Sequence, residues 1–370
     1  MQNDAGQNLT NPFDGPSFPP PIEHTNPPPV RLNRVERFYF HGTGLEYFGI
    51  WIVNLLLVIV TLGMYSPWAK VRRLRYFYGN TELIHRYFDF TGLPRKILIG
   101  RLIALAIYFV ISILSKQSAE WMIAGVVIVW IAIPWLIRST IRFNARNSKF
   151  TNTRFFFAGT NKTAYWIFIK SMLLLVFTLG LALPVVLWMY KKYCFEHLYA
   201  GQLKFRLNAT WLNFMWAVYL PFIIFVVLQM FIWGGMSVPS PDALLQSGRM
   251  AKLVGQIFAI YILVFFIILP WIQARIFIAT WNNVVLSRSK FQTDCRSSTF
   301  VWIVVTNWIL RILSVGLLTP WAAIRIYRYK VESLSLVIHN DPDTMMNQLQ
   351  QDPNGVAEEI TDIFDLDISL

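Results

Sequence analysis

The residues that enzymes use for acid–base, nucleophilic and metal chemistry are sparse and scattered in this sequence. The histidines and the two cysteines share no metal-ligand spacing, and Glu82-x-x-His85 matches no metal motif. There is no Gly-rich phosphate loop, no G-x-S-x-G and no HExxH, and no Asp or Glu lies inside a hydrophobic span. The sequence therefore predicts that the protein is not an enzyme and that it binds no metal and no cofactor.

Polar side chains inside the apolar segments are more informative. A charge in hydrocarbon costs a few kcal/mol, so such a group reaches an interface or lines a polar cavity. Two interpretations stay open: a polar seam among the helices, or hydrogen bonds that hold the helices together, and we favour the second. The residues concerned are Asn54, Lys170, Ser171, Asn307, Arg311 and Arg101.

Basic residues cluster beside Trp and Tyr after three of the apolar segments. The net charge is +13, but no recognition module accompanies it, so we expect no nucleic acid. The expected partners are the lipid bilayer and anionic phospholipids; protein partners and oligomeric state stay open. The candidate headgroup contacts are Lys70, Arg72, Arg73, Arg75, Lys191, Lys192, Arg325, Arg328 and Lys330.

These residues belong to a segment that occurs three times at constant offsets. Each copy has an aromatic strand, a hydrophobic helix, a break, a basic aromatic helix and a second strand. We predict repeat units at 36–92, 153–209 and 290–339, and we expect the two strands of each unit to pair with each other. Glycine and proline mark the break in every copy: Gly63 and Pro67, Gly180 and Pro184, and Gly316 and Pro320.

The composition of the chain is typical of an integral membrane protein. Hydrophobic residues make up 55% and charged residues 14% of it. Residues 35–340 form the predicted membrane domain, in which hydrophobic hairpins at 97–137 and 211–273 separate the repeats. They supply four predicted spans, Ile97–Leu114, Trp121–Ile137, Trp211–Trp233 and Leu253–Trp271. Residues 1–30 are predicted to be a disordered Pro-rich tail and residues 341–370 an acidic tail.

Charge decides between two topologies. If each repeated helix enters and leaves by one face, only Lys116, Arg249 and Lys252 face outward, as the positive-inside bias requires. We therefore predict a mainly α, multi-pass membrane protein with internal repeats, four full spans and three re-entrant or shallow helices. Short cytoplasmic β-strands would bracket each repeat, with both termini in the cytoplasm. Seven spans is the alternative.

The run NLLLVIVTLGMYSPWAKVRRLRYFYGNTEL, followed by FDFTGLPRKILIGR, carries a family resemblance. It resembles the YjgN-like inner-membrane family of Gram-negative bacteria, a domain family of unknown function. The TLG-x-YSPWAKVRRLRY core is fairly specific, and the resemblance covers most of residues 35–335. It implies a bacterial inner-membrane protein with multiple passes, and it supplies no activity or ligand.

Two function classes follow from these features. Broken helices and internal repeats favour a transporter- or channel-like protein for an unidentified solute. The alternative is a membrane scaffold or anionic-lipid-interacting protein that does not transport and uses its basic aromatic collar. The first is slightly favoured, on the analogy between the broken helices and those of transporters.

Overall fold

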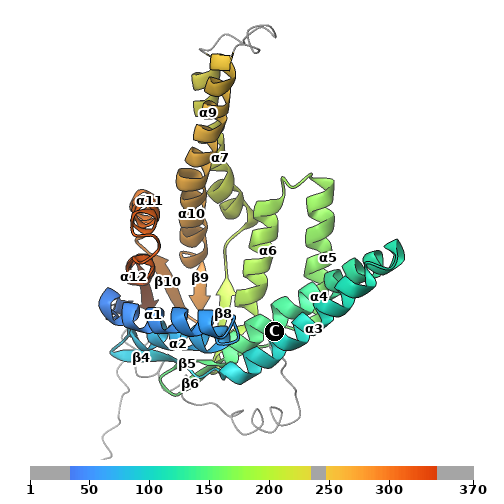
Figure 1. The fold of residues 1–370 in the computed structure, drawn as a ribbon. Coiled ribbons are helices and arrows are strands. Elements are labelled where there is room, and N and C mark those ends of the chain that lie inside the picture. Colours follow the sequence, from blue (N-terminus) through green and yellow to red (C-terminus); the bar gives the residue numbers. More distant parts are fainter. Residues whose placement is uncertain (1–33, 235–246, 340–370) are drawn as a thin grey trace, which may run out of the picture. The chain divides into compact units, whose positions relative to one another are not determined.

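The computed structural model describes residues 34–234 and 247–339. The predicted Pro-rich tail (1–30) and acidic tail (341–370) lie outside the described residues, so both stay predictions. Within the described part, pairs of helices alternate with short strands (Figure 1).

Each of the first three helix pairs runs into a β-hairpin. The first pair is α1 (Gly44–Val60) and α2 (Ser66–Gly79), followed by β3 (Thr81–Leu83) and β4 (Arg86–Phe90). The second is α3 (Pro94–Leu114) and α4 (Ala119–Arg146), followed by β5 (Ser148–Phe150) and β6 (Thr153–Phe157). The third is α5 (Asn161–Phe177) and α6 (Leu183–Glu196), followed by β7 (Leu198–Ala200) and β8 (Leu203–Leu207).

The last two pairs vary this plan. α7 (Trp211–Gly234) is paired with a helical stretch made of α9 (Ser247–Leu263), the π-helical η1 (Val264–Ile268) and α10 (Leu269–Trp281). It leads to β9 (Val284–Leu286) and β10 (Ser289–Thr293). α11 (Ser297–Leu313) and α12 (Thr319–Glu332) lead to β11 (Leu334–Ile338), and β1 (Arg34–Arg37) and β2 (Tyr39–Phe40) precede α1.

All these strands form one antiparallel, 11-stranded sheet in the order β1-β11-β10-β9-β8-β7-β6-β5-β4-β3-β2. The first and last strands of that order, β1 and β2, are separated in the chain by Phe38 alone. One extended segment thus pairs with β11 through β1 and with β3 through β2. It closes the sheet into a small barrel that leaves no unpaired edge for another chain to join.

The same backbone hydrogen bond holds together the base of every helix pair. A residue just before the first helix donates its N–H to the carbonyl of a residue just after the second helix. The pairs are His41 to Asn80 (2.9 Å), Thr91 to Asn147 (2.8 Å), Ala158 to His197 (2.8 Å), Asn208 to Asn283 (2.9 Å) and Asp294 to Ser333 (3.0 Å). Each helix pair therefore leaves the barrel and returns to it at one place, and residues 34–234 and 247–339 contain five copies of one unit.

Equivalent side chains from the five units pack the inside of the barrel. One layer, at most 5% exposed, is Leu83, Phe150, Ala200, Leu286 and Leu336. A neighbouring layer is Phe38, Phe88, Phe155, Phe205 and Phe291, in which four neighbouring pairs of ring centroids lie 6.2–6.3 Å apart. The interior of the barrel is therefore an aromatic and aliphatic core and not a pore.

The predicted fold class was wrong about the strands and the number of repeats. The strands do not bracket three units; they form one barrel that joins successive units through β4–β5, β6–β7 and β8–β9. The segments predicted as hairpins between repeats, 97–137 and 211–273, are themselves the helices of two further units. Strands β3, β5, β7 and β9 escaped prediction because they have only three residues each and follow a helix almost directly.

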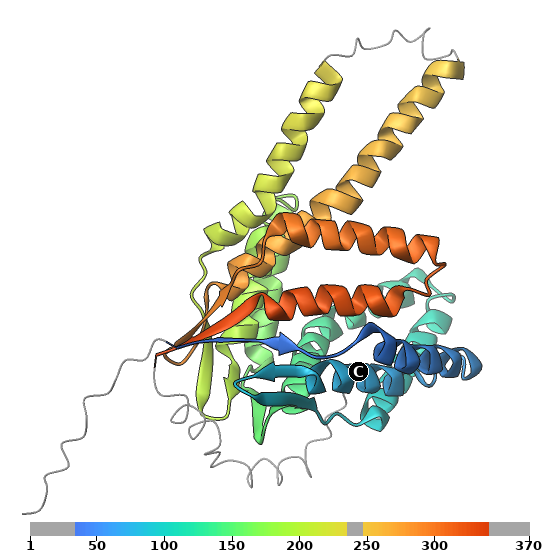
Figure 2. The same cartoon turned by 90° about the vertical axis from the view of Figure 1, so that its left-hand side faces the viewer.

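Three described helices are long and apolar enough to cross a membrane: Pro94–Leu114, Ala119–Arg146 and Trp211–Phe231. The most apolar windows of these helices are only 11–17% buried inside the protein, so their side chains face outward. They coincide with three of the four predicted spans. The fourth, Leu253–Trp271, falls in α9, η1 and α10, and the long pair that it shares with α7 projects away from the sheet (Figure 2).

Candidate functional site

The three predicted break segments have one conformation. Leu62, Leu179 and Val315 adopt left-handed φ values of 49°, 48° and 51°, and the following glycines have φ values of 90°, 86° and 86°. Gly63 donates its N–H to the Val58 carbonyl at 2.7 Å, and Gly180 and Gly316 make equivalent bonds. This is the Schellman pattern that ends an α-helix, and the left-handed position that it requires is held by the leucine or valine before each glycine.

A hydroxyl at each break also starts the second helix. Thr61 accepts the N–H of Tyr65 at 3.0 Å, and Thr178 and Ser314 accept equivalent bonds in the other two copies. Ser314 thus replaces threonine without loss of the turn. The predicted prolines Pro67, Pro184 and Pro320 are buried in the first turn of α2, α6 and α12, where no N–H is needed.

The tips of these three hairpins are apolar and almost fully exposed. Leu62 is 94% exposed, Leu179 93% and Val315 93%. A leucine or valine in the left-handed region is uncommon in any protein, and at the tip of a hairpin in water it would gain nothing from burial. The three tips therefore form the same kind of unpartnered apolar surface three times.

The basic residues of the second helices have mixed environments. Arg72 and Arg73 are exposed, and the Arg72 guanidinium lies 5.7 Å from the Tyr65 ring centroid. Arg75 donates to the Phe90 carbonyl at 3.1 Å, and its equivalent Arg328 donates to the Gly42 carbonyl at 2.7 Å. The last two therefore connect neighbouring units as well as presenting charge.

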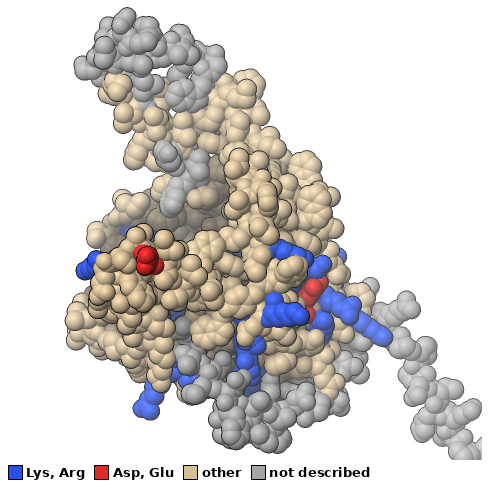
Figure 3. All heavy atoms as spheres, turned by 90° about the vertical axis from the view of Figure 1, so that its right-hand side faces the viewer, with Lys and Arg blue, Asp and Glu red and all other residues tan. Residues whose placement is uncertain are grey.

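The remaining predicted headgroup contacts are also divided. Lys192 pairs with Glu196 at 3.6 Å, and Arg325 donates to the Thr306 hydroxyl at 2.7 Å. Lys330 lies 5.3 Å from the Phe300 ring centroid, and Lys70 is half-buried. Lys191 lines the cavity described below. On the face drawn in Figure 3, the visible Lys and Arg side chains lie over the middle and lower parts of the molecule, and none is seen among the tan atoms of the upper part.

The predicted seam residues fall into separate helix pairs. Asn54, Ser171 and Asn307 are all buried, in α1, α5 and α11 respectively. Asn307 donates from its side-chain amide to the Ala322 carbonyl of α12 at 3.0 Å. This bond between helices agrees with the interpretation favoured from the sequence. Lys170 is exposed, with its ammonium 4.8 Å from the Trp166 ring centroid.

The two arginines of the predicted seam are also placed apart. Arg101 of α3 donates to the hydroxyl of Ser66 at the start of α2, and so connects the first and second units. Arg311 of α11 lies 5.9 Å from the Trp308 ring centroid. The sequence indicated that these positions are polar. In the structure they lie at several separate contacts of the helices.

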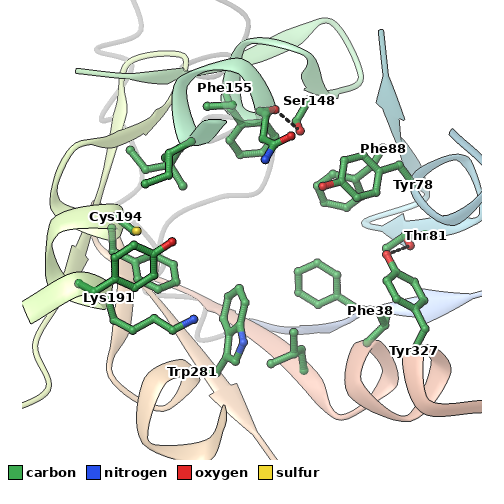
Figure 4. A pocket seen from close by; sticks show the side chains of 18 residues that line it. Phe38, Tyr78, Thr81, Phe88, Ser148, Phe155, Lys191, Cys194, Trp281 and Tyr327 are labelled. Carbon is green, nitrogen blue, oxygen red and sulfur yellow. Dashed lines mark hydrogen bonds between the residues drawn. The ribbon is translucent and has the colours of Figure 1, made fainter. Parts of the chain in front are cut away.

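A cavity of about 520 Å³ lies where the second helices of all five units meet the barrel. Figure 4 shows Phe38, Phe88, Phe155, Lys191 and Trp281 arranged around it. One equivalent position, two residues before the end of each pair, supplies five lining residues: Tyr78, Ala145, Phe195, Trp281 and Val331. Sequence analysis missed this site, although the repeated Phe-x-Phe strands that lead into each unit were visible.

Glu82 forms a cluster with His41 and His85 on the outside of the barrel. Glu82 accepts a hydrogen bond from His41, and His85 lies 3.2 Å from its other oxygen. The hydrogen bond from His41 lowers the pKa of Glu82. Within the described residues, no group of three or more His, Cys, Asp or Glu side chains could hold a metal ion.

A family model described as "Bacterial protein of unknown function (DUF898)" matches residues 35–363. The chain belongs to this family. The inner membrane protein YjgN of Escherichia coli is 32% identical over 146 residues, which are 39% of this chain and 36% of that protein. YjgN of Salmonella typhimurium is 28% identical over 157 residues, 42% of this chain and 39% of that protein. No solved structure matches.

The match to YjgN spans well under half the length of either protein, whereas the DUF898 match includes all five units. The resemblance seen in the sequence is thereby confirmed. Together with the three apolar helices, it identifies this DUF898 chain as a membrane protein.

Proposed function

We propose that this chain is an inner-membrane, lipid-interacting protein that works from one face of the bilayer. Its barrel would lie at that face, four helical stretches (α3, α4, α7 and the returning α9–η1–α10) would cross the membrane, and the three short helix pairs would lie shallowly in the near leaflet. The inner membrane is inferred from the names of the relatives, and the cytoplasmic face from the distribution of Lys and Arg. No catalytic reaction is part of this proposal.

The exposed apolar tips carry the proposal. Burial of a leucine or valine side chain is worth about 1.5–3 kcal/mol, so three bare tips in water would forgo several kcal/mol. Contact with acyl chains recovers that energy without requiring a protein partner. The helices are also short: α1 has 17 residues, or about 25 Å, against a hydrocarbon core of about 30 Å.

The first short pair divides its polarity between its two helices. In the first pair, α1 exposes Leu56, Ile59 and Val60, whereas α2 exposes Arg72 and Arg73. A hairpin of this kind suits the boundary between acyl chains and headgroups, with the apolar helix immersed and the basic helix beside anionic phosphates. Full immersion would place the arginines in hydrocarbon, which costs more than the tip gains.

Two observations favour lipid interaction over transport. The helix breaks satisfy their own backbone groups with capping bonds and lie at hairpin tips, so they turn the chain without lining a binding site. The barrel interior is closed by buried side chains. Transport of a solute stays a prediction.

The depth of the tips tests the proposal. Single cysteines would replace Leu62, Leu179 and Val315 in a chain whose Cys194 and Cys295 are changed to alanine, and each would carry a bimane fluorophore in reconstituted bilayers. We expect brominated acyl chains to quench all three probes strongly and aqueous iodide to quench them weakly. Ser287→Cys, in the exposed β9–β10 turn, is the matched control and should show the opposite pattern.

Depth-dependent quenching reports how far the tips enter the bilayer, and labelling from one side separates the two topologies. Bromines near the headgroups should quench the tips more than bromines at the bilayer centre. Efficient iodide quenching, or labelling of the tip cysteines from the periplasmic side by an impermeant maleimide, would overturn the proposal.

A further inference from the structure

The cavity at the centre of the five units has the composition of a binding site for an amphiphile. Its volume of about 520 Å³ lies in the range of small-molecule pockets, about 300–1,000 Å³. The side chains of Phe38, Phe88 and Phe155 line the barrel side, and Tyr78, Phe195 and Trp281 line the side of the helices (Figure 4). A long apolar group would therefore contact carbon on the barrel side and on the helix side.

Most of the polar groups on the wall already have partners in the protein. Thr81 donates to the Phe77 carbonyl at 2.7 Å and lies 3.1 Å from the Tyr327 hydroxyl. Ser148 donates to the Asn144 carbonyl at 2.7 Å. These hydroxyls are thus occupied, and the wall that they form behaves as an apolar surface.

Lys191 is the exception. It is the charged residue that lines the cavity, and among the described ion pairs none includes it, whereas the adjacent Lys192 is paired with Glu196. A half-buried ammonium at the edge of an apolar cavity lacks the counter-charge that such groups usually have. An anionic head attached to a hydrocarbon chain would satisfy both the ammonium and the wall.

We infer that this cavity binds the acyl chain of an anionic amphiphile, with its carboxylate or phosphate beside Lys191. The inference rests on the proposed function, because contact with the bilayer gives such a molecule access to the protein. The packed layer of Leu83, Phe150 and Leu336 below the aromatic residues stops the chain from passing through the barrel. The site therefore holds its ligand and does not conduct it.

The five units suggest how to fill the cavity. The position held by Ala145 in the second unit is held by Phe195 in the third and Trp281 in the fourth. Ala145→Phe places there a side chain that the equivalent helix already tolerates. Val331→Phe does the same from the fifth unit, and Ala104→Phe, on the exposed face of α3, is the matched control.

Binding would be measured with cis-parinaric acid and with its neutral methyl ester, added to the full chain in nanodiscs, by energy transfer from tryptophan. We expect saturable binding of the acid that weakens at least tenfold in Ala145→Phe and Val331→Phe and is unchanged in Ala104→Phe. Lys191→Gln should weaken binding of the acid about tenfold and leave the ester unchanged, as loss of a charged hydrogen bond predicts. The midpoint of unfolding in SDS identifies any variant that fails to fold.

Saturable binding that survives both filling variants, or an acid and an ester that respond equally to Lys191→Gln, would overturn the inference. An absence of saturable binding in the unaltered protein would also overturn it. These outcomes are distinct from failure of the proposed function, because tip quenching at Leu62 is measured independently of any cavity ligand. Tips exposed to iodide would refute the shallow insertion even if the cavity bound the acid.

Discussion

Gly92 shows why three of the five units require glycine before their first helix. A Cβ atom added at Gly92 would lie 2.5 Å from Cε1 and 2.8 Å from Cζ of the Phe90 ring, well inside a normal contact. Phe90 is 1% exposed and packs edge-on against Tyr78 and Phe143, so its ring has no free space to enter. Gly92→Ala should therefore force two buried groups into the same volume.

A comparison of the five units shows how the clash is avoided where glycine is absent. In three units a glycine lies two residues after a phenylalanine: Phe40 and Gly42, Phe90 and Gly92, and Phe157 and Gly159. Where a Cβ is present, the partner is smaller: Leu207 precedes Ala209, and Thr293 precedes Cys295. The clash at Gly92 should therefore depend on the phenylalanine and not on the glycine alone.

A double-mutant cycle measures this dependence. Overpacking typically costs about 1–3 kcal/mol, so we expect Gly92→Ala to lower the free energy of unfolding by about 2 kcal/mol. In a Phe90→Leu background the same change should cost less than about 0.5 kcal/mol, a coupling of about 1.5 kcal/mol. Unfolding in mixed micelles with SDS, followed by tryptophan fluorescence, gives all four values. Additive costs, with coupling near zero, would refute the reasoning.

Three further changes test the barrel. Leu336→Ala removes a side chain that is 1% exposed in the barrel core and should cost about 2–5 kcal/mol in the same SDS titration; a cost under about 1 kcal/mol would contradict a packed interior. Arg328→Gln loses the bond to the Gly42 carbonyl and should cost about 1–3 kcal/mol, and an unchanged midpoint would show that this link between units is dispensable. The bond from His41 lowers the pKa of Glu82 below 4.5, so this carboxylate stabilises the fold above that pH and its contribution is lost as the pH falls. Glu82→Gln should flatten the decline in unfolding midpoint as the pH falls below about 5, and parallel curves would argue against it.

The sequence predicted those features that depend on residues close together in the chain. Three hairpin turns could be located from Gly63, Gly180 and Gly316, because a helix that reverses direction needs a left-handed residue and a cap within a few positions. Long apolar runs likewise predicted α3, α4 and α7, since spanning a bilayer requires length and composition alone. The polarity of Asn307 predicted a bond between helices that the structure contains.

The barrel could not be derived in the same way, because its closure is non-local. The segment 34–40 pairs with β11, some 300 residues later in the sequence, as well as with β3. Two of the five units also lack a break of the Thr-Leu-Gly or Ser-Val-Gly form, so their longer helices concealed their equivalence to the other three. The shared strand Phe88-x-Phe90-x-Gly92, which leads into α3, was the signal that could have revealed it.

The sidedness of the β-hairpin turns tests the central claim most directly. Single cysteines at His85, Asn152, Gln202 and Arg288, all exposed, would be labelled in spheroplasts and in inverted vesicles with an impermeant maleimide, again without the two native cysteines. One barrel to which every helix pair returns predicts that all four label from the same, cytoplasmic side. Labelling of His85 and Gln202 from opposite sides, as seven crossings would require, would contradict the account.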